Sequence, residues 1–165
     1  MPVTGKLPGG EIPGGKRAGG QLVSILPQLS VRGAQAALAF YRAAFGAEVV
    51  YQVGGTADNP SVVAQLSVDG AGFWVADESP EHASYSPESL GGATTKMLLI
   101  VADPQAVIER AVGEGAALVY PAGKEHGWLL GRVQDPFGHH WEIGKPLGPW
   151  PPDRPRHAPG FPPLP

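Results

Sequence analysis

The sequence predicts an α+β fold made of two βαβββ modules, and an internal repeat is the main observation behind this prediction. The stretch VRGAQAALAFYRAAFGAEVVY at 31–51 recurs as VADPQAVIERAVGEGAALVY at 101–120. Each copy has an apolar strand before a helix and a β-branched or aromatic strand after it. Two more strands follow each copy, joined by turns that begin with Asp and end with Gly, at 69–72 and 135–138. The modules are expected to form a curled mixed sheet around a cup, with helices on the outer face.

The two expected helices bury equivalent faces, because their apolar residues recur at the i, i+3, i+4, i+7 spacing of one helix side. Each begins at a small or capping residue and ends at a glycine able to take a left-handed conformation. These boundaries are Gly33 to Gly46 for the first helix and Asp103 to Gly115 for the second. The matched apolar residues are Ala34, Ala37, Leu38 and Tyr41 in the first and Pro104, Val107, Ile108 and Ala111 in the second.

Alternation of side chains along each strand assigns residues to the helix side or to the cup. The expected strands are 25–31, 47–53, 61–68 and 72–77 in the first module, and 94–101, 117–121, 128–134 and 139–144 in the second. Gln28 and Lys96 then face the cup, as do His140 and Glu142 on the last strand. When the two similar turn sequences, at 69–72 and 135–138, are aligned, Glu142 corresponds to Ala76 and His140 to Trp74.

Composition excludes several classes of function. The chain has 165 residues and a net charge of −3, without a basic run interleaved with aromatics, so nucleic-acid binding is not expected. There is no cysteine for a disulfide, a thiolate metal site or a nucleophile. No apolar run approaches the roughly 20 residues of a membrane span, and the N-terminus lacks an apolar signal core. We therefore expect a cytoplasmic protein that does not bind membranes.

Glycine and proline concentrate at the two ends of the chain. We expect a flexible Gly/Pro-rich tail at 1–21, a single folded domain at 22–147 and a Pro-rich tail at 148–165.

Two segments resemble the vicinal oxygen chelate superfamily, which includes glyoxalase I, bleomycin-resistance proteins, fosfomycin-resistance enzymes and extradiol dioxygenases. They are LAFYRAAFGAEVV at 38–50 and GRVQDPFGHHWEIGKP at 131–146, and the second is similar to the closing hairpin of the PhnB-type, glyoxalase-like branch. The resemblance covers residues 22–147. It implies that any metal would be held by residues of the first and last strands of each module, which here are Leu26, Ala76, Lys96 and Glu142.

Of those four positions only Glu142 could be a metal ligand, so the resemblance implies that the usual metal site is lost and that no cofactor is needed. We expect Lys96 to pair with Glu142 and to replace the charge of the metal. A buried pair of this kind leaves an uncompensated charge costing roughly 3–5 kcal/mol when one partner is removed. The alternatives are that Lys96 extends into solvent beside a solvated Glu142, or that Glu142 has a raised pKa and acts as a general base.

A different metal site is a further hypothesis, in which His126, His140 and Glu142 meet in space. The competing interpretation is that these histidines are exposed or hydrogen-bonded without a metal.

Trp74 and Trp128 are expected to line the cup, where aromatic rings suit flat ligands, whereas Phe73 is expected to pack in the core.

Two classes of function follow from these residues. The first is a homodimeric, metal-free protein that binds a small, flat or aromatic organic molecule. Its expected ligand contacts are Gln28, Trp74, Lys96, His126, Trp128 and His140. The second is an enzyme: a metal-dependent lyase, isomerase or dioxygenase using His126, His140 and Glu142, or a metal-free acid/base catalyst using Glu142.

Overall fold

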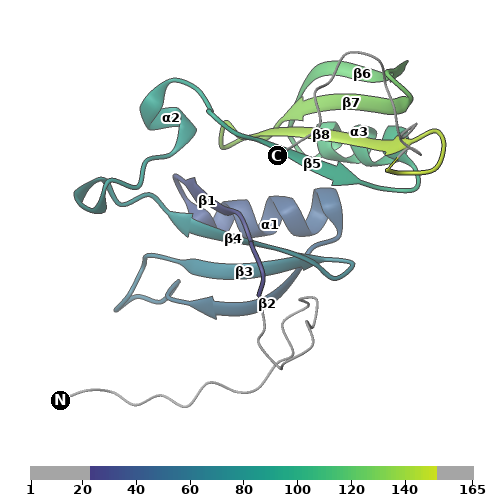
Figure 1. Cartoon of the computed structure of the whole chain (residues 1–165). Coiled ribbons are helices and arrows are strands. Elements are labelled where there is room, and N and C mark those ends of the chain that lie inside the picture. Colours follow the sequence, from purple (N-terminus) through teal and green to yellow (C-terminus); the bar gives the residue numbers. More distant parts are fainter. Residues whose placement is uncertain (1–22, 152–165) are drawn as a thin grey trace, which may run out of the picture. The chain divides into compact units, whose positions relative to one another are not determined.

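The computed structural model describes residues 23–151, and it contains the predicted module twice (Figure 1). The expected N-terminal tail and most of the expected C-terminal tail lie outside the described residues. The chain divides into two compact units, and the boundary after the first module lies between Tyr85 and Ser86. The first module consists of β1 (Gln28–Val31), α1 (Ala34–Phe45), β2 (Glu48–Val53), β3 (Val63–Val68) and β4 (Ala71–Asp77). The second consists of β5 (Lys96–Ile100), α3 (Pro104–Gly113), β6 (Ala117–Glu125), β7 (Trp128–Gln134) and β8 (His140–Pro146).

Each module has its own open sheet of four strands, with the same topology in both. The strand order is β1-β4-β3-β2 in the first and β5-β8-β7-β6 in the second. The first strand of each module runs parallel to the last, and the other pairs are antiparallel. The predicted α+β class and the βαβββ repeat are therefore confirmed, with one mixed sheet per module. The cup that the two modules would form together stays a prediction.

One face of each sheet is buried, as the alternation of side chains predicted. In the first module Tyr41 of α1 is fully buried and meets Phe73 of β4 edge to face, with ring centroids 5.4 Å apart. Phe73 therefore belongs to the core, as expected. In the second module α3 contacts β6, β7 and β8 and buries Ile108, while Trp141 and Ile143 of β8 are also buried. The polar residues of β8 lie on the opposite face.

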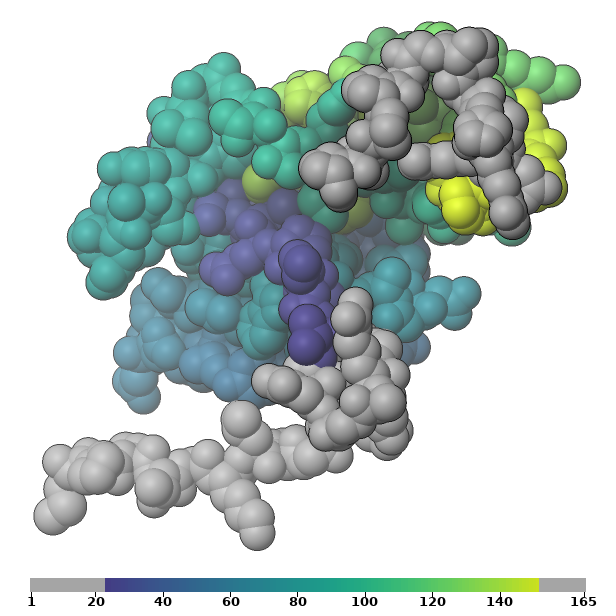
Figure 2. All heavy atoms as spheres, viewed as in Figure 1, coloured from purple at the N-terminus to yellow at the C-terminus, as the bar shows by residue number. Residues whose placement is uncertain are grey.

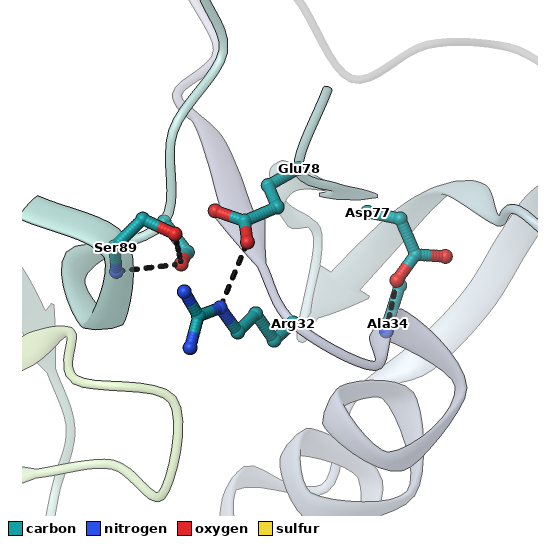
Figure 3. A network of polar contacts seen from close by, with 6 residues as sticks. Arg32, Ala34, Asp77, Glu78 and Ser89 are labelled. Atoms are coloured by element: carbon teal, nitrogen blue, oxygen red, sulfur yellow. Dashed lines mark hydrogen bonds and ion pairs between the residues drawn. The ribbon is translucent and has the colours of Figure 1, made fainter. Parts of the chain in front are cut away.

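The start of α1 is held by a side chain from the end of β4. Gly33 occupies the cap position at φ 76° and has no side chain to offer, but Asp77 Oδ1 accepts a hydrogen bond from the backbone N of Ala34 at 2.8 Å (Figure 3). Asp77 Oδ2 accepts from the backbone N of Val62 at 2.8 Å. Asp77 thus joins the last strand, the helix and the segment before β3 in the first module.

The other helix ends agree with the sequence except at one position. Asp103 caps α3 by accepting from the backbone N of Ala106 at 3.1 Å, and Gly46 ends α1 at φ 68°, both as predicted. The predicted glycine end of α3 is wrong, because the helix stops at Gly113 and Glu114 is its C-cap. Gly115 follows with a φ of 110° and turns the chain toward β6.

The segment between the modules contains short helices that the sequence analysis treated as a loop. They are a turn of 3-10 helix (Pro80–His82) and α2 (Pro87–Leu90), the latter capped by Ser86, which accepts from the backbone N of Ser89 at 3.2 Å (Figure 3). Most of residues 78–92 are exposed, and they form the teal surface on the left of Figure 2. No helix within residues 23–151 is both long enough and apolar enough to cross a membrane.

Candidate functional site

The candidate site lies on the face of the second sheet that points away from α3, which we call the open face. Cross-strand pairing places Lys96 beside His140, Leu98 beside Glu142, and Arg132 beside Glu142. Leu98 and Ile100 are about half exposed on this face, at 50% and 55%. The open face therefore combines a small charged cluster with an exposed apolar border.

Three donors converge on one oxygen of Glu142. Lys96 Nζ donates to Oε1 at 2.9 Å, Arg132 Nη2 donates to the same oxygen at 2.6 Å, and the Tyr120 hydroxyl donates to it at 3.4 Å. We call Lys96, Tyr120, Arg132 and Glu142 the Glu142 cluster. The predicted Lys96 to Glu142 pair is confirmed at hydrogen-bond length. The Lys96 side chain is 52% exposed and that of Glu142 only 19%, so the ammonium both reaches solvent and pairs with the acid.

Arg132 is the member of the cluster that the sequence analysis missed. Its guanidinium carbon lies 5.0 Å from the centroid of the Tyr120 ring, a cation–π contact that fixes its orientation. Its Nε is buried and has no hydrogen-bond partner among residues 23–151. The sequence analysis gave no signal for it, because the expected turn at 135–138 would pair Gln134 with His139. The observed turn at 135–139 pairs Gln134 with His140 and therefore Arg132 with Glu142.

The cluster keeps Glu142 ionised. Partial burial alone would raise the pKa of Glu142, but the hydrogen bonds from Lys96 and Arg132, together with their positive charges, outweigh it and lower the pKa below 4.5. The hydrogen bond that Arg132 donates to Glu142 in turn raises the pKa of Arg132. The alternative in which Glu142 has a raised pKa is therefore wrong, since the neighbouring cations favour the charged form.

The residues of the alternative metal site do not meet. His140 is at the start of β8 and pairs with Lys96, whereas His126 lies in the turn before β7, whose first residue Trp128 pairs with Pro146 at the end of β8. At about 3.3 Å per residue, the length of β8 separates them by roughly 20 Å. The His126 side chain is 90% exposed and contacts the adjacent Glu125 at 3.6 Å. The structure therefore does not bring His126, His140 and Glu142 together.

The donor set on the open face does not suit a divalent metal either. Among residues 23–151 there is no group of three or more His, Cys, Asp or Glu side chains placed to hold an ion. On this face Glu142 is already surrounded by two cationic side chains, which would repel a metal cation.

The first module presents a related but uncharged arrangement. Trp74 of β4 pairs with Gln28 of β1 and with Gln65 of β3, and Gln65 pairs with Tyr51 of β2. The Tyr51 and Trp74 rings meet at 5.8 Å between centroids. Gln28 and Trp74, two of the predicted ligand contacts, are thus neighbours in the first module.

This pairing corrects the correspondence between the modules. Tyr120, Arg132 and Glu142 follow one another across the second sheet as Tyr51, Gln65 and Trp74 do across the first. Glu142 therefore corresponds to Trp74 and not to Ala76. The predicted register was wrong because the second hairpin turn, at 135–139, is longer than the first, at 69–70. The corrected position carries no metal-binding atom either.

Trp128 is placed differently from the other predicted contacts. It lies at the end of β7 opposite to the Glu142 cluster, and its ring packs edge to face on Trp150 at 4.9 Å between centroids. Its role in ligand binding stays a prediction, as do those of His126 and His140.

Comparison with known proteins gives the family. The profile of the glyoxalase/bleomycin resistance protein/dioxygenase superfamily matches residues 21–143. An uncharacterized protein of Mycobacterium bovis is 36% identical over 129 residues, which cover 75% of this chain and 84% of that protein.

Solved structures agree with this assignment. A gene product of Arabidopsis thaliana superposes with a TM-score of 0.57 at 27% identity, covering 74% of this chain and 97% of that one. The fosfomycin resistance protein FosX from Listeria monocytogenes, solved with Mn(II) and sulfate, shares the fold with a TM-score of 0.56 at 14% identity, over 74% of this chain and 91% of its own. The chain belongs to the glyoxalase/bleomycin resistance protein/dioxygenase superfamily.

Proposed function

We propose that this chain binds a small, flat organic molecule on the open face of its second module, and that Lys96 and Arg132 occupy the electrostatic role that a metal has in metalloenzymes of the superfamily. The observation that carries the proposal is the convergence of both cations on Glu142 Oε1, at 2.9 and 2.6 Å. A carboxylate neutralised in this way needs no divalent ion.

The surroundings of the cluster support binding. Leu98 and Ile100 expose apolar surface next to it, and the Tyr120 ring supports the Arg132 guanidinium from within the same sheet. A small set of fixed polar groups bordered by apolar and aromatic side chains is the usual composition of a site for small organic ligands.

A lowered pKa does not favour a general base, because a carboxylate that holds its charge tightly is a weak proton acceptor at neutral pH. We therefore propose binding rather than acid/base catalysis by Glu142. FosX was solved with Mn(II), and a metal-dependent activity of this chain is the outcome that would replace our proposal.

The test combines two measurements on untagged protein purified without chelators. Elemental analysis is expected to find Mn, Fe, Ni and Zn well below one equivalent per chain. A screen of flat organic molecules by NMR is expected to shift the backbone amide resonances of Leu98 and Glu142. One equivalent of a transition metal that disappears in Glu142→Gln would overturn the proposal.

Two finer assignments accompany it. We infer that the chain is part of the PhnB-type branch, from the closing hairpin at 131–146, and that it forms a homodimer, because each open sheet has unpaired edge strands. Size-exclusion chromatography with light scattering tests the second assignment, and a mass of 17.1 kDa would contradict it.

A further inference from the structure

We infer that the group recognised by the Glu142 cluster is an uncharged amide-like edge, in which an N–H lies next to a C=O. This inference rests on the proposed binding function and adds the chemistry of the ligand. It starts from the two oxygens of Glu142, which are not equivalent.

Oε1 of Glu142 accepts all three hydrogen bonds of the cluster. Within residues 23–151 no hydrogen bond reaches Oε2. Arg132 Nε and His140 Nδ1 are the buried side-chain atoms without a partner in this part of the chain, so Oε2 is open to solvent. The cluster therefore offers one free acceptor that carries negative charge.

Lys96 provides a donor next to this acceptor. Its ammonium has three N–H bonds, of which one is directed at Oε1, and its side chain is 52% exposed. A ligand that approaches the open face thus meets a charged acceptor and a charged donor side by side. Both make stronger hydrogen bonds than neutral groups do.

The two groups that a ligand would touch, Glu142 Oε2 and Lys96 Nζ, carry opposite charges, so an ionic ligand of either sign lies beside one like charge. A carboxylate bound by Lys96 would lie against the free oxygen of Glu142, and two adjacent carboxylates repel each other. A cation bound by Oε2 would lie beside the ammonium of Lys96, in a cluster where two positive groups already surround one negative group. An uncharged amide makes a hydrogen bond with each of the two groups, because its N–H donates to Glu142 Oε2 and its C=O accepts from Lys96 Nζ.

The apolar border fits the remainder of such a molecule. Leu98 pairs directly with Glu142, and Ile100 follows on the same face of β5, both about half exposed. A flat ring attached to the amide can cover them and remove apolar surface from water. The ligand class is therefore an aromatic carboxamide or a lactam.

Three probes with the same ring test this inference: benzamide, benzoate and benzamidinium. Their affinities at pH 7 are measured for the full chain by NMR titration, following the amide resonances of Leu98 and Glu142. Benzamide is expected to bind about tenfold more tightly than either ion, the effect of one well-made hydrogen bond. Benzoate or benzamidinium binding as tightly as benzamide would overturn the inference while leaving the binding site in place.

Two variants make the test sharper, because each should favour a different ion in the order of affinities of the three probes. Glu142→Gln removes the negative charge and should raise the affinity for benzoate relative to that for benzamide. Lys96→Met removes the donor and its positive charge, and should raise the affinity for benzamidinium relative to that for benzamide. Glu125→Gln is the matched control, because this carboxyl is 63% exposed at the far end of β6, and the substitution should leave the order of the three affinities unchanged. If none of the probes shifts the two resonances, the proposed binding face itself fails.

Discussion

Glu142 is the residue on which the account of the site depends, and its environment defines what it can do. It lies on the exposed face of a strand, yet its side chain is only 19% exposed because Lys96, Arg132 and Tyr120 surround it. A carboxylate held in this way is fixed in position and in charge. It can orient a ligand, but it is poorly suited to take up a proton.

The two cations of the cluster should contribute unequally to stability. The Arg132 side chain is 23% exposed and makes the shorter contact, whereas that of Lys96 is 52% exposed and partly screened by water. Arg132→Met should lower the free energy of unfolding by about 1–3 kcal/mol, and Lys96→Met by less than about 1 kcal/mol. Urea unfolding at pH 7 measures both. A larger loss in Lys96→Met would contradict this ranking.

The pKa of Glu142 predicts how stability depends on pH. A folded-state pKa below the ordinary value of 4.5 means that the carboxylate stabilises the fold above that pH and loses its contribution as the pH falls through the depressed value. The difference in unfolding free energy between the wild type and Glu142→Gln should therefore shrink on acidification below about 4.5. Urea unfolding at several pH values between neutral and strongly acidic measures it. A difference that grows on acidification would contradict the prediction.

At the scale of elements, the hairpin between β7 and β8 determines where Glu142 lies. Asp135 is 4% exposed; its Oδ1 accepts from the backbone N of Phe137 at 3.0 Å and of His139 at 2.9 Å, and its Oδ2 accepts from Trp141 Nε1 at 2.9 Å. One side chain thus organises the turn and anchors the buried face of β8.

Asp135→Asn should destabilise the protein, because the introduced amide cannot satisfy all three donors. The expected loss is about 1–3 kcal/mol in the free energy of unfolding. Asp69→Asn is the matched control in the exposed turn of the first module, and it should have little effect because Asn tolerates the positive φ of 51° found there. Thermal and urea unfolding compare the two. Equal effects would show that the turn does not depend on the buried carboxylate.

The packing of β7 against α3 depends on a missing side chain. A Cβ at Gly131 would lie 2.5 Å from Ile108 Cδ1 and 2.8 Å from the backbone N of Ala122, whereas a Cβ at Gly123 would meet nothing within 4 Å. Gly131→Ala should therefore lower the free energy of unfolding by about 1–3 kcal/mol. Gly123→Ala, in the neighbouring strand, should not. A neutral Gly131→Ala in urea unfolding would contradict the close packing.

Periodicity was sufficient to predict the elements, since alternating and helical patterns are set by neighbours along the chain. All strands and both long helices appear near the positions that the repeat gave them, although β1 starts at Gln28 rather than at 25, β6 continues to Glu125 rather than ending at 121, and α3 ends at Gly113. The correspondence between Glu142 and Ala76 failed because the length of a turn is not determined by the pattern of the strands beside it. Arg132 was missed because its partner lies across a hairpin.

At the scale of the whole molecule, two modules of the same topology have diverged at equivalent positions. The line of residues Tyr120, Arg132 and Glu142 is charged in the second module, and its counterpart Tyr51, Gln65 and Trp74 is uncharged in the first. The superfamily assignment fixes the fold, whereas the activity depends on such residues.

The most direct test of the account is an NMR titration of the Glu142 side-chain carboxyl, with and without one equivalent of Zn²⁺. We predict a midpoint below 4.5 and no change on adding zinc, because Lys96 and Arg132 already neutralise the carboxylate. A midpoint at or above 4.5, or a zinc-dependent shift of this carboxyl resonance, would contradict it.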